Sequence, residues 1–253
     1  MKLATWNVNS LKVRLPHVLG WLVANQPDVL CLQETKQQDE DFPKAELEAA
    51  GYYSVFSGQR TYNGVAILSR EPAADVQYGI PNYADDQKRV IAATFKDVRV
   101  VCLYVPNGQS VDSDKYYYKL GWLSALRDWL RDELTRHPKL AALGDYNIAP
   151  EDRDVYDPVT WPGSVLVREA ERIQFQNLIR LGLRDSFRLF EQAEKSYTWW
   201  DYRMMAFRRN RGLRLDHILV SEPLAKKCIS CVIDKTPRKL ERPSDHTPVV
   251  VEL

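Results

Sequence analysis

The sequence has little cysteine, almost no net charge and no long apolar run, and each absence excludes a class of protein. Four cysteines in 253 residues exclude a disulfide scaffold and favour a reducing compartment, so we expect a cytoplasmic protein. A net charge of +1 excludes bulk attraction to nucleic acid or to membranes, so any charge argument must be local. No run is long and apolar enough to span a bilayer, and residues 1–6 are expected to form a strand rather than a signal peptide.

The cysteines themselves suggest no chemistry. Cys228 and Cys231 form a C-x-x-C pair, which supplies half of a zinc site in other settings. No second Cys/His pair provides the other two ligands, so we favour a coincidence at a strand end. Cys31 and Cys102 lie in apolar runs and are expected to be small core residues.

What the sequence does contain is an alternation of strand and helix patterns without repeats or linkers, so we expect a single domain over residues 1–253. Apolar runs bounded by turn residues predict strands at 3–8, 28–33, 64–68, 90–95, 99–105, 139–144, 214–220 and 247–252. Apolar residues at helical spacing predict helices at 11–24, 114–136 and 168–181. This mixture predicts an α/β or α+β fold.

Polar residues stand at the ends of several of these apolar strands. They are Asn7, Glu34, Asp145, Asn147, Asp216, Asp245 and His246. Charged groups beside buried strands are costly unless they are paired or bound to a metal ion. Any one of them has a plain alternative as a strand-end cap or a surface ion pair. Several together predict convergence on one pocket.

The residue types in this set indicate a particular chemistry. The candidate ligands are carboxylate or amide oxygens, which suit Mg²⁺ or Mn²⁺ rather than zinc. His246, next to an acid in the sequence, suits a different task, which is to stabilise developing negative charge or to handle a proton. A metal, a water-activating carboxylate and a histidine together favour attack of water on a phosphate ester.

Eight sequence blocks carry a family resemblance that spans nearly the whole chain. They are WNVNSL at 6–11, PDVLCLQETK at 27–36, YNGVAIL at 62–68, YVPNG at 104–108, GDYNIAP at 144–150, YTWWDY at 197–202, RGLRLD at 211–216 and PSDHTP at 243–248. In these blocks and in their order the chain resembles the exonuclease III / apurinic-apyrimidinic endonuclease family of the endonuclease/exonuclease/phosphatase superfamily. One block alone would be a weak signal, whereas eight in order are very specific.

The resemblance implies a four-layer sandwich of two packed mixed β-sheets flanked by helices, and a Mg²⁺ cofactor with Mn²⁺ as the alternative. It implies that metal is held near Asn7, Glu34, Asp145, Asn147, Asp245 and His246. Within this set Glu34 would be the main ligand, and Asp145 would position or deprotonate the attacking water with help from Asn147. Tyr104 would contact the scissile phosphate. His246, oriented by Asp216, would stabilise the charge on the phosphate in the transition state.

DNA binding must come from local basic and apolar groups, because the net charge is so small. The residues that we expect at the DNA are Lys12, Arg14, Lys36, Asn107, Trp199, Arg203, Met204, Arg208 and Leu213. Arginines from Arg203 to Arg214 alternate with apolar residues, a combination that can hold phosphates and open a base step. We expect Trp199, Leu213 and Leu215 to line the sugar pocket. The alternatives are a solvated basic loop and a Trp199 that belongs to the core.

The stretch from 152 to 171 departs from the family pattern. Many relatives have a small residue followed by Phe-x-Pro, where this chain has Ser164-Val165-Leu166-Val167-Arg168. We expect these bulkier side chains to narrow the pocket for a baseless sugar. The resemblance therefore implies a DNA-repair nuclease with 3′–5′ exonuclease or 3′-end trimming activity, and we expect it to work as a monomer. Its expected partner is double-stranded DNA with nicks, recessed 3′ ends or abasic sites, while incision at abasic sites stays open.

Two other functions remain as alternatives. The chain could be a phosphodiesterase of the same superfamily with a substrate other than DNA, such as a sphingomyelinase or an inositol-phosphate phosphatase. The blocks at 197–202 and 203–214 argue against this alternative. It could also be a DNA-binding module that has kept the fold without the chemistry. The presence of every expected ligand and of His246 argues against that second alternative.

Overall fold

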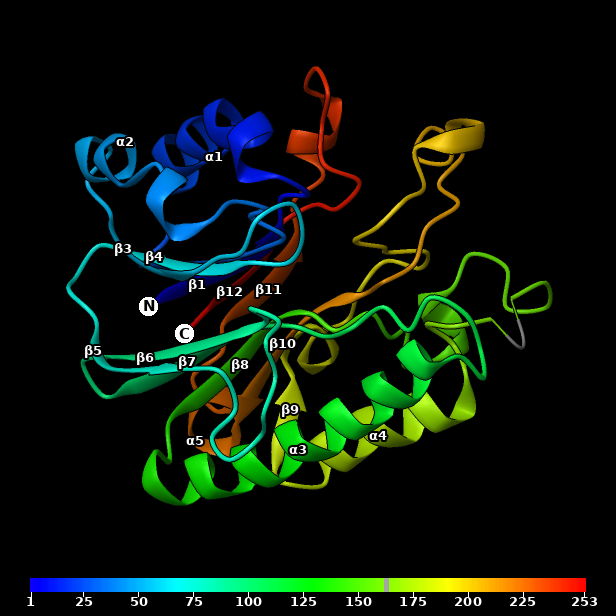
Figure 1. Cartoon of the computed structure of the whole chain (residues 1–253). Helices are drawn as coiled ribbons and strands as arrows, with labels where there is room; N and C mark the ends of the chain where they lie inside the picture. Colours follow the sequence, from blue (N-terminus) through cyan, green and yellow to red (C-terminus); the bar gives the residue numbers. More distant parts are fainter. Residues whose placement is uncertain (162–163) are drawn as a thin grey trace.

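Two mixed β-sheets packed face to face form the centre of the computed structural model, which describes residues 1–161 and 164–253 (Figure 1). In spatial order the first sheet consists of β11 (Ser230–Ile233), β12 (Val249–Glu252), β1 (Lys2–Asn7), β2 (Val29–Gln33), β4 (Val65–Ser69) and β3 (Tyr53–Ser57). The second consists of β5 (Ala74–Tyr78), β6 (Val90–Phe95), β7 (Val98–Tyr104), β8 (Leu140–Asp145), β10 (Asp216–Ser221) and β9 (Leu183–Asp185). Parallel pairs occur at β1–β2 and β7–β8.

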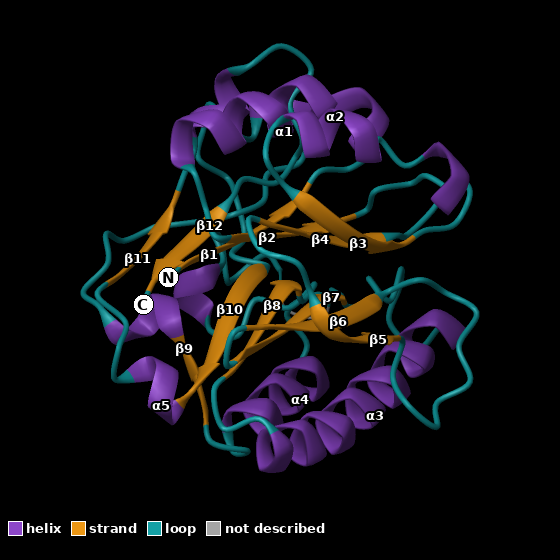
Figure 2. Ribbon diagram, turned by 90° about the vertical axis from the view of Figure 1, so that its left-hand side faces the viewer, coloured by secondary structure: helices purple, strands orange, loops and turns teal. Residues whose placement is uncertain are grey.

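Helices cover the outer face of each sheet. The α-helices are α1 (Leu11–Asn25), α2 (Lys44–Ala49), α3 (Asp114–Arg136), α4 (Glu169–Ile179) and α5 (Glu222–Ala225). Figures 1 and 2 show α1 and α2 over the first sheet, and α3 and α4 over the second. This arrangement confirms the predicted four-layer sandwich. Within the described part of the chain, no helix has both the length and the apolar character needed to cross a membrane.

The strands at the centre of each sheet are buried along their whole length and are mostly apolar. Every residue of β2, β4, β7 and β8 is buried, because each sheet has the other sheet on one face and helices on the opposite face. Cys31 and Cys102 belong to the core between the sheets, as the sequence predicts. All four cysteines are free thiols.

The elements that the sequence predicts are all present, with ends displaced by no more than two residues. The strands that it misses are β3, β5, β9 and β11, which are the four outermost strands of the two sheets. Edge strands bury only part of their side chains and therefore lack the continuous apolar run that marks a central strand. The short helices α2 and α5 were also not predicted.

Strand register aligns three of the predicted site residues. Tyr104 on β7 pairs with Asp145 on β8, and Asp145 pairs with Asp216 on β10. The three residues are thus neighbours on one rung of the second sheet. Gly144 allows this close approach, because a Cβ atom there would lie 1.8 Å from the backbone oxygen of Leu103.

We predict that Gly144→Ala destabilises the protein by more than about 3 kcal/mol, since the added methyl would overlap the β7 backbone, which cannot move without breaking the sheet. Urea unfolding would measure the change. Gly121→Ala is the matched control, because Gly121 lies in α3 with open space around its Cα. It should stabilise the protein by about 0.5–1 kcal/mol. Equal midpoints for Gly144→Ala and the unmodified chain would contradict the steric argument.

Candidate active site

The amide of Asn7 joins the two sheets at the edge where β1, β2 and β8 end. Its Nδ2 donates hydrogen bonds to Glu34 Oε1 at 2.8 Å and to Asp145 Oδ2 at 2.9 Å. Its Oδ1 accepts the backbone N–H of Asn9 at 2.9 Å. The predicted ligand Asn7 therefore lies among the acidic groups, but it presents its nitrogen to them. In this arrangement it holds the two carboxylates close together.

Asp145 is fully enclosed at the end of β8. Its Oδ1 accepts the backbone N–H of Asn147 at 2.9 Å. Burial is the main reason that the pKa of Asp145 rises to about 7, with the Asp216 carboxylate raising it further and His246 opposing both. Asn147 has a positive φ of 48° and donates to Val105 O at 2.9 Å. The turn at Asn147 is thus held on both sides of the carboxylate.

His246 and Asp216 form a buried ion pair, with Nδ1 and Oδ2 2.8 Å apart. Burial alone would lower the pKa of His246, but the carboxylates of Asp216 and Asp145 outweigh it and raise the pKa to about 10. The imidazole is therefore a cation at neutral pH. Its Nε2 lies 3.7 Å from Asp145 Oδ2, so the charged ring faces the site.

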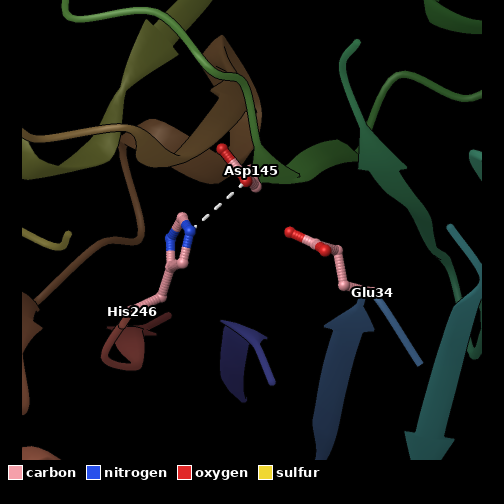
Figure 3. Close-up of side chains that lie close together, drawn as sticks. All are labelled: Glu34, Asp145 and His246. Carbon is pink, nitrogen blue, oxygen red and sulfur yellow. Dashed lines mark ion pairs between the residues drawn. The ribbon is translucent and has the colours of Figure 1, made fainter. Parts of the chain in front are cut away.

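Glu34, Asp145 and His246 point toward a common space (Figure 3). One ligand atom from each of them lies within 4.8 Å of the others. The two carboxylates bring the oxygen donors that Mg²⁺ and Mn²⁺ prefer. Asp216 Oδ1 is buried and has no hydrogen-bond partner among the described residues, which adds to the negative potential. The donor chemistry therefore fits a divalent cation.

Tyr104 closes the space from the β7 side. Burial raises the pKa of its hydroxyl well above the usual value, and the Glu34 and Asp145 carboxylates add to the shift. The Arg89 guanidinium lies 4.7 Å from the centre of the Tyr104 ring. The hydroxyl is therefore a neutral hydrogen-bond donor at this site.

Asp245 lies beside this cluster rather than within it. Its Oδ1 accepts from Asn9 Nδ2 at 2.9 Å, and its Oδ2 accepts from Trp199 Nε1 at 3.0 Å. Trp199 is half-buried. Its exposure is therefore intermediate between that of the expected pocket residue and that of the alternative, a core residue. A hollow of about 430 Å³ lies next to both residues. A larger cavity of about 800 Å³ lies between α1 and the β11–β12 edge, and neither Glu34 nor Asp145 lines it.

The residues predicted to bind DNA fall into three groups. Lys12, Arg203, Met204 and Arg208 are exposed, and Arg203 pairs with Asp201 at 2.7 Å. Arg14, Lys36 and Asn107 make hydrogen bonds to other residues of the protein. Arg14 donates to the backbone oxygens of Asn9 and Pro243, and Lys36 pairs with Glu34 at 2.9 Å. These two cations therefore brace the site.

The third group is buried, and here the sequence predictions were wrong. Leu213 is 0% and Leu215 1% exposed, because Leu166 and Val167 cover them in one apolar cluster. They do not line an open sugar pocket. Arg214, counted among the basic run, is also buried and pairs with Asp154 at 2.7 Å. It cannot contact DNA.

Two hydroxyl groups that the sequence did not single out connect the site. Ser244 donates to Asn7 O at 2.7 Å and accepts from the backbone N–H of His246. Thr198 Oγ1 accepts the backbone N–H groups of Leu215 and Asp216. Both residues lie in blocks that carry the family resemblance, and this position was the only sequence signal that could have identified them. The sequence alone does not show which backbone group each hydroxyl binds.

The sequence profile of the Endonuclease/Exonuclease/phosphatase family matches residues 4–246. The chain belongs to this family. Exodeoxyribonuclease III of Haemophilus influenzae is 36% identical over 100% of the chain and 99% of its own length. A 3′ phosphatase from Neisseria, solved with a product DNA hairpin, is 51% identical with a TM-score of 0.98, covering 100% of this chain and 99% of that one. An AP endonuclease from Archaeoglobus fulgidus is 41% identical with a TM-score of 0.97 over the same shares.

These relatives confirm that the chain belongs to the exonuclease III / apurinic-apyrimidinic endonuclease branch of the family. They also cover the chain from end to end, so the residues of both sheets that meet at Asn7 lie within the shared fold.

We predict opposite charge states for two buried histidines of the metal-free protein at pH 7. His246 should be protonated. His217 should be neutral, because burial and the nearby Arg214 lower its pKa to about 4. Histidine ¹⁵N NMR over a pH series would show this, and Asp216→Asn should lower the pKa of His246 but leave that of His217. A neutral His246 at pH 7 would contradict the assignment of His246 and Asp216 as an ion pair.

The same ion pair makes stability depend on pH. The pKa of His246 is about 10 in the folded protein against an ordinary value of 6.5. Between these two pH values, folding is therefore accompanied by uptake of a proton. The stabilisation is fully present below about pH 6.5 and is lost as the pH rises through about 10. The difference in unfolding free energy between the unmodified chain and Asp216→Asn should therefore shrink over that range.

Proposed function

We propose that this chain is a metal-dependent DNA-repair nuclease that trims 3′ ends of double-stranded DNA. The observation that carries the proposal is the convergence of Glu34 and Asp145 on an imidazolium, His246. Oxygen ligands for a divalent cation beside a fixed positive charge suit hydrolysis of a phosphodiester. The relatives with nuclease and 3′ phosphatase names support DNA as the substrate.

In the proposed mechanism Glu34 and Asp145 would hold Mg²⁺, with Mn²⁺ as the alternative, and Asp245 and Asn9 would support its surroundings. When bound, the ion supplies positive charge that offsets the charge of the phosphate. Asp145, which faces His246 at the end of β8, orients the attacking water and takes its proton as a general base. Asn147 holds Asp145 in place.

His246 and Tyr104 act on the phosphate in this proposal. The His246 cation faces the site from the side opposite Glu34 and stabilises the negative charge that develops on the phosphate oxygens. Asp216 keeps the ring oriented and charged. Tyr104, a neutral donor, hydrogen-bonds a phosphate oxygen.

The loop at 164–168 favours 3′ ends over abasic sites. Leu166 has a φ of 80°, a conformation that costs a leucine energy, and it belongs to one buried apolar cluster with Leu213 and Leu215. We expect this cluster to fill the space that a baseless sugar would need. Duplexes with recessed 3′ ends or nicks are the substrates that we propose, and incision at abasic sites should be slow.

We further propose that the chain works as a monomer, as one domain and in the cytoplasm. Strands from the two ends of the chain and from its middle share the core between the sheets, which supports one folding unit. Four free thiols agree with a reducing compartment. Light scattering of the purified protein would test the monomer.

We predict that Asp145→Asn and His246→Ala each lower the rate on a recessed 3′ end with Mg²⁺ by at least about 10²-fold, because each removes a group that acts in the transition state. Single-turnover assays on a labelled duplex would measure the rates. Asp97→Asn is the control, since Asp97 lies in the β6–β7 turn at the far end of the sheet. Full activity of either site variant would refute its role.

We predict that Leu166→Gly raises incision at a central abasic analogue by about 10-fold or more relative to trimming of a recessed 3′ end. Glycine relieves the positive φ, and loss of the leucine side chain empties the space beside Leu213. Product analysis on both duplexes, with a 3′-phosphate duplex as a third, would measure the ratio. Val159→Gly, at an exposed position of the same connection, is the control. Fast incision by the unmodified chain would contradict the proposed preference.

A further inference from the structure

Another buried ion pair lies behind the site, between the helices under the second sheet. Lys119 of α3 and Glu171 of α4 are both 0% exposed, and Lys119 Nζ donates directly to Glu171 Oε1. Two charges in the interior are costly to desolvate, and replacing such a pair with apolar groups is often neutral for stability. Stability alone therefore does not explain why it is there.

The lysine end of the pair holds the backbone of the proposed catalytic turn. Lys119 Nζ donates to Asn147 O at 2.7 Å and to Asn107 O at 3.2 Å. The side chains of these two asparagines are themselves joined, with Asn107 Nδ2 3.1 Å from Asn147 Oδ1. One ammonium group thus fixes the two loops that follow β7 and β8.

The glutamate end holds the loop that borders the pocket. Glu171 Oε1 accepts the backbone N–H of Leu166 at 3.0 Å, and Oε2 accepts that of Arg168 at 3.1 Å. The carbonyl of Leu166 is held as well, because Ala149 donates its backbone N–H to Leu166 O at 2.7 Å. Leu166 is therefore held in its unfavourable positive-φ conformation by groups on both sides.

We propose that the Lys119–Glu171 ion pair is a positioning device that couples the loop at 164–168 to the Asn147 turn and thereby sets the preference between 3′ ends and abasic sites. This inference rests on the proposed nuclease function. The pair touches no substrate. It acts by keeping Leu166 over Leu213 and by keeping Asn147 against Asp145.

The test is the double variant Lys119→Met/Glu171→Met, which removes both charges and leaves no unpaired one in the interior. We expect kcat on a recessed 3′ end to fall about 10-fold or more, because a small displacement at the reacting groups is costly. We expect KM to change little. Because Leu166 is released, the ratio of abasic-site incision to 3′-end trimming should rise about 10-fold.

The matched control is Arg99→Met/Glu133→Met. This second pair is also buried and also uses α3, but it lies at the other end of that helix, with Nε and Oε2 2.7 Å apart. It should change thermal stability without changing the substrate ratio. A Lys119/Glu171 variant that loses stability but keeps the ratio and kcat of the unmodified chain would overturn the inference.

Glu171→Gln keeps the test decisive if the double variant does not fold. This substitution preserves the shape of the side chain and an acceptor for the Leu166 N–H, but it removes the charge that pairs with Lys119. The ratio of abasic-site incision to 3′-end trimming should therefore rise by a few-fold. An unchanged ratio in a folded Glu171→Gln protein would overturn the inference. Failure of the unmodified chain to hydrolyse either duplex would instead count against the proposed nuclease function.

Discussion

Mutual repulsion among carboxylates is the constraint on which this structure depends. Glu34, Asp145 and Asp216 meet at one edge of two sheets, in an interior where like charges repel strongly. Two groups keep them there: the Asn7 amide, which donates to Glu34 and Asp145, and the His246 cation, which pairs with Asp216. The same crowding of negative charge is what makes the edge attractive to a divalent metal ion.

The two sheets contribute different residues to this cluster of carboxylates and to the groups that stabilise it. The first sheet brings Asn7 and Glu34 from the parallel strands β1 and β2, and the turn before β12 brings His246. The second sheet brings Tyr104, Asp145 and Asp216 on one rung of its register. Face-to-face packing of the sheets is therefore necessary for the site to exist, and the bond from Asn7 to Asp145 connects the halves directly.

Several cations near the site contribute to the fold. Arg14, Lys36 and Arg214 all make short contacts within the protein, and Lys119 is wholly interior. The exposed segment around Arg203 to Arg208 carries side chains that we propose for contact with DNA. An almost neutral chain can in this way carry a basic segment beside an acidic pocket.

The sequence by itself determined the central strands, the long helices and the identity of the polar groups at the strand ends. Buried strands need continuous apolar runs, and polar residues at their ends stand out against them. It missed β3, β5, β9 and β11 because an edge strand has no comparable pattern. Only the tertiary structure decided that Leu213 and Arg214 are buried while Arg203 is exposed, since a basic run reads alike whether its side chains face solvent or a buried acid such as Asp154. The sequence likewise did not predict the pairing of Lys119 with Glu171, because these residues are 52 positions apart and come together only through the packing of α3 and α4.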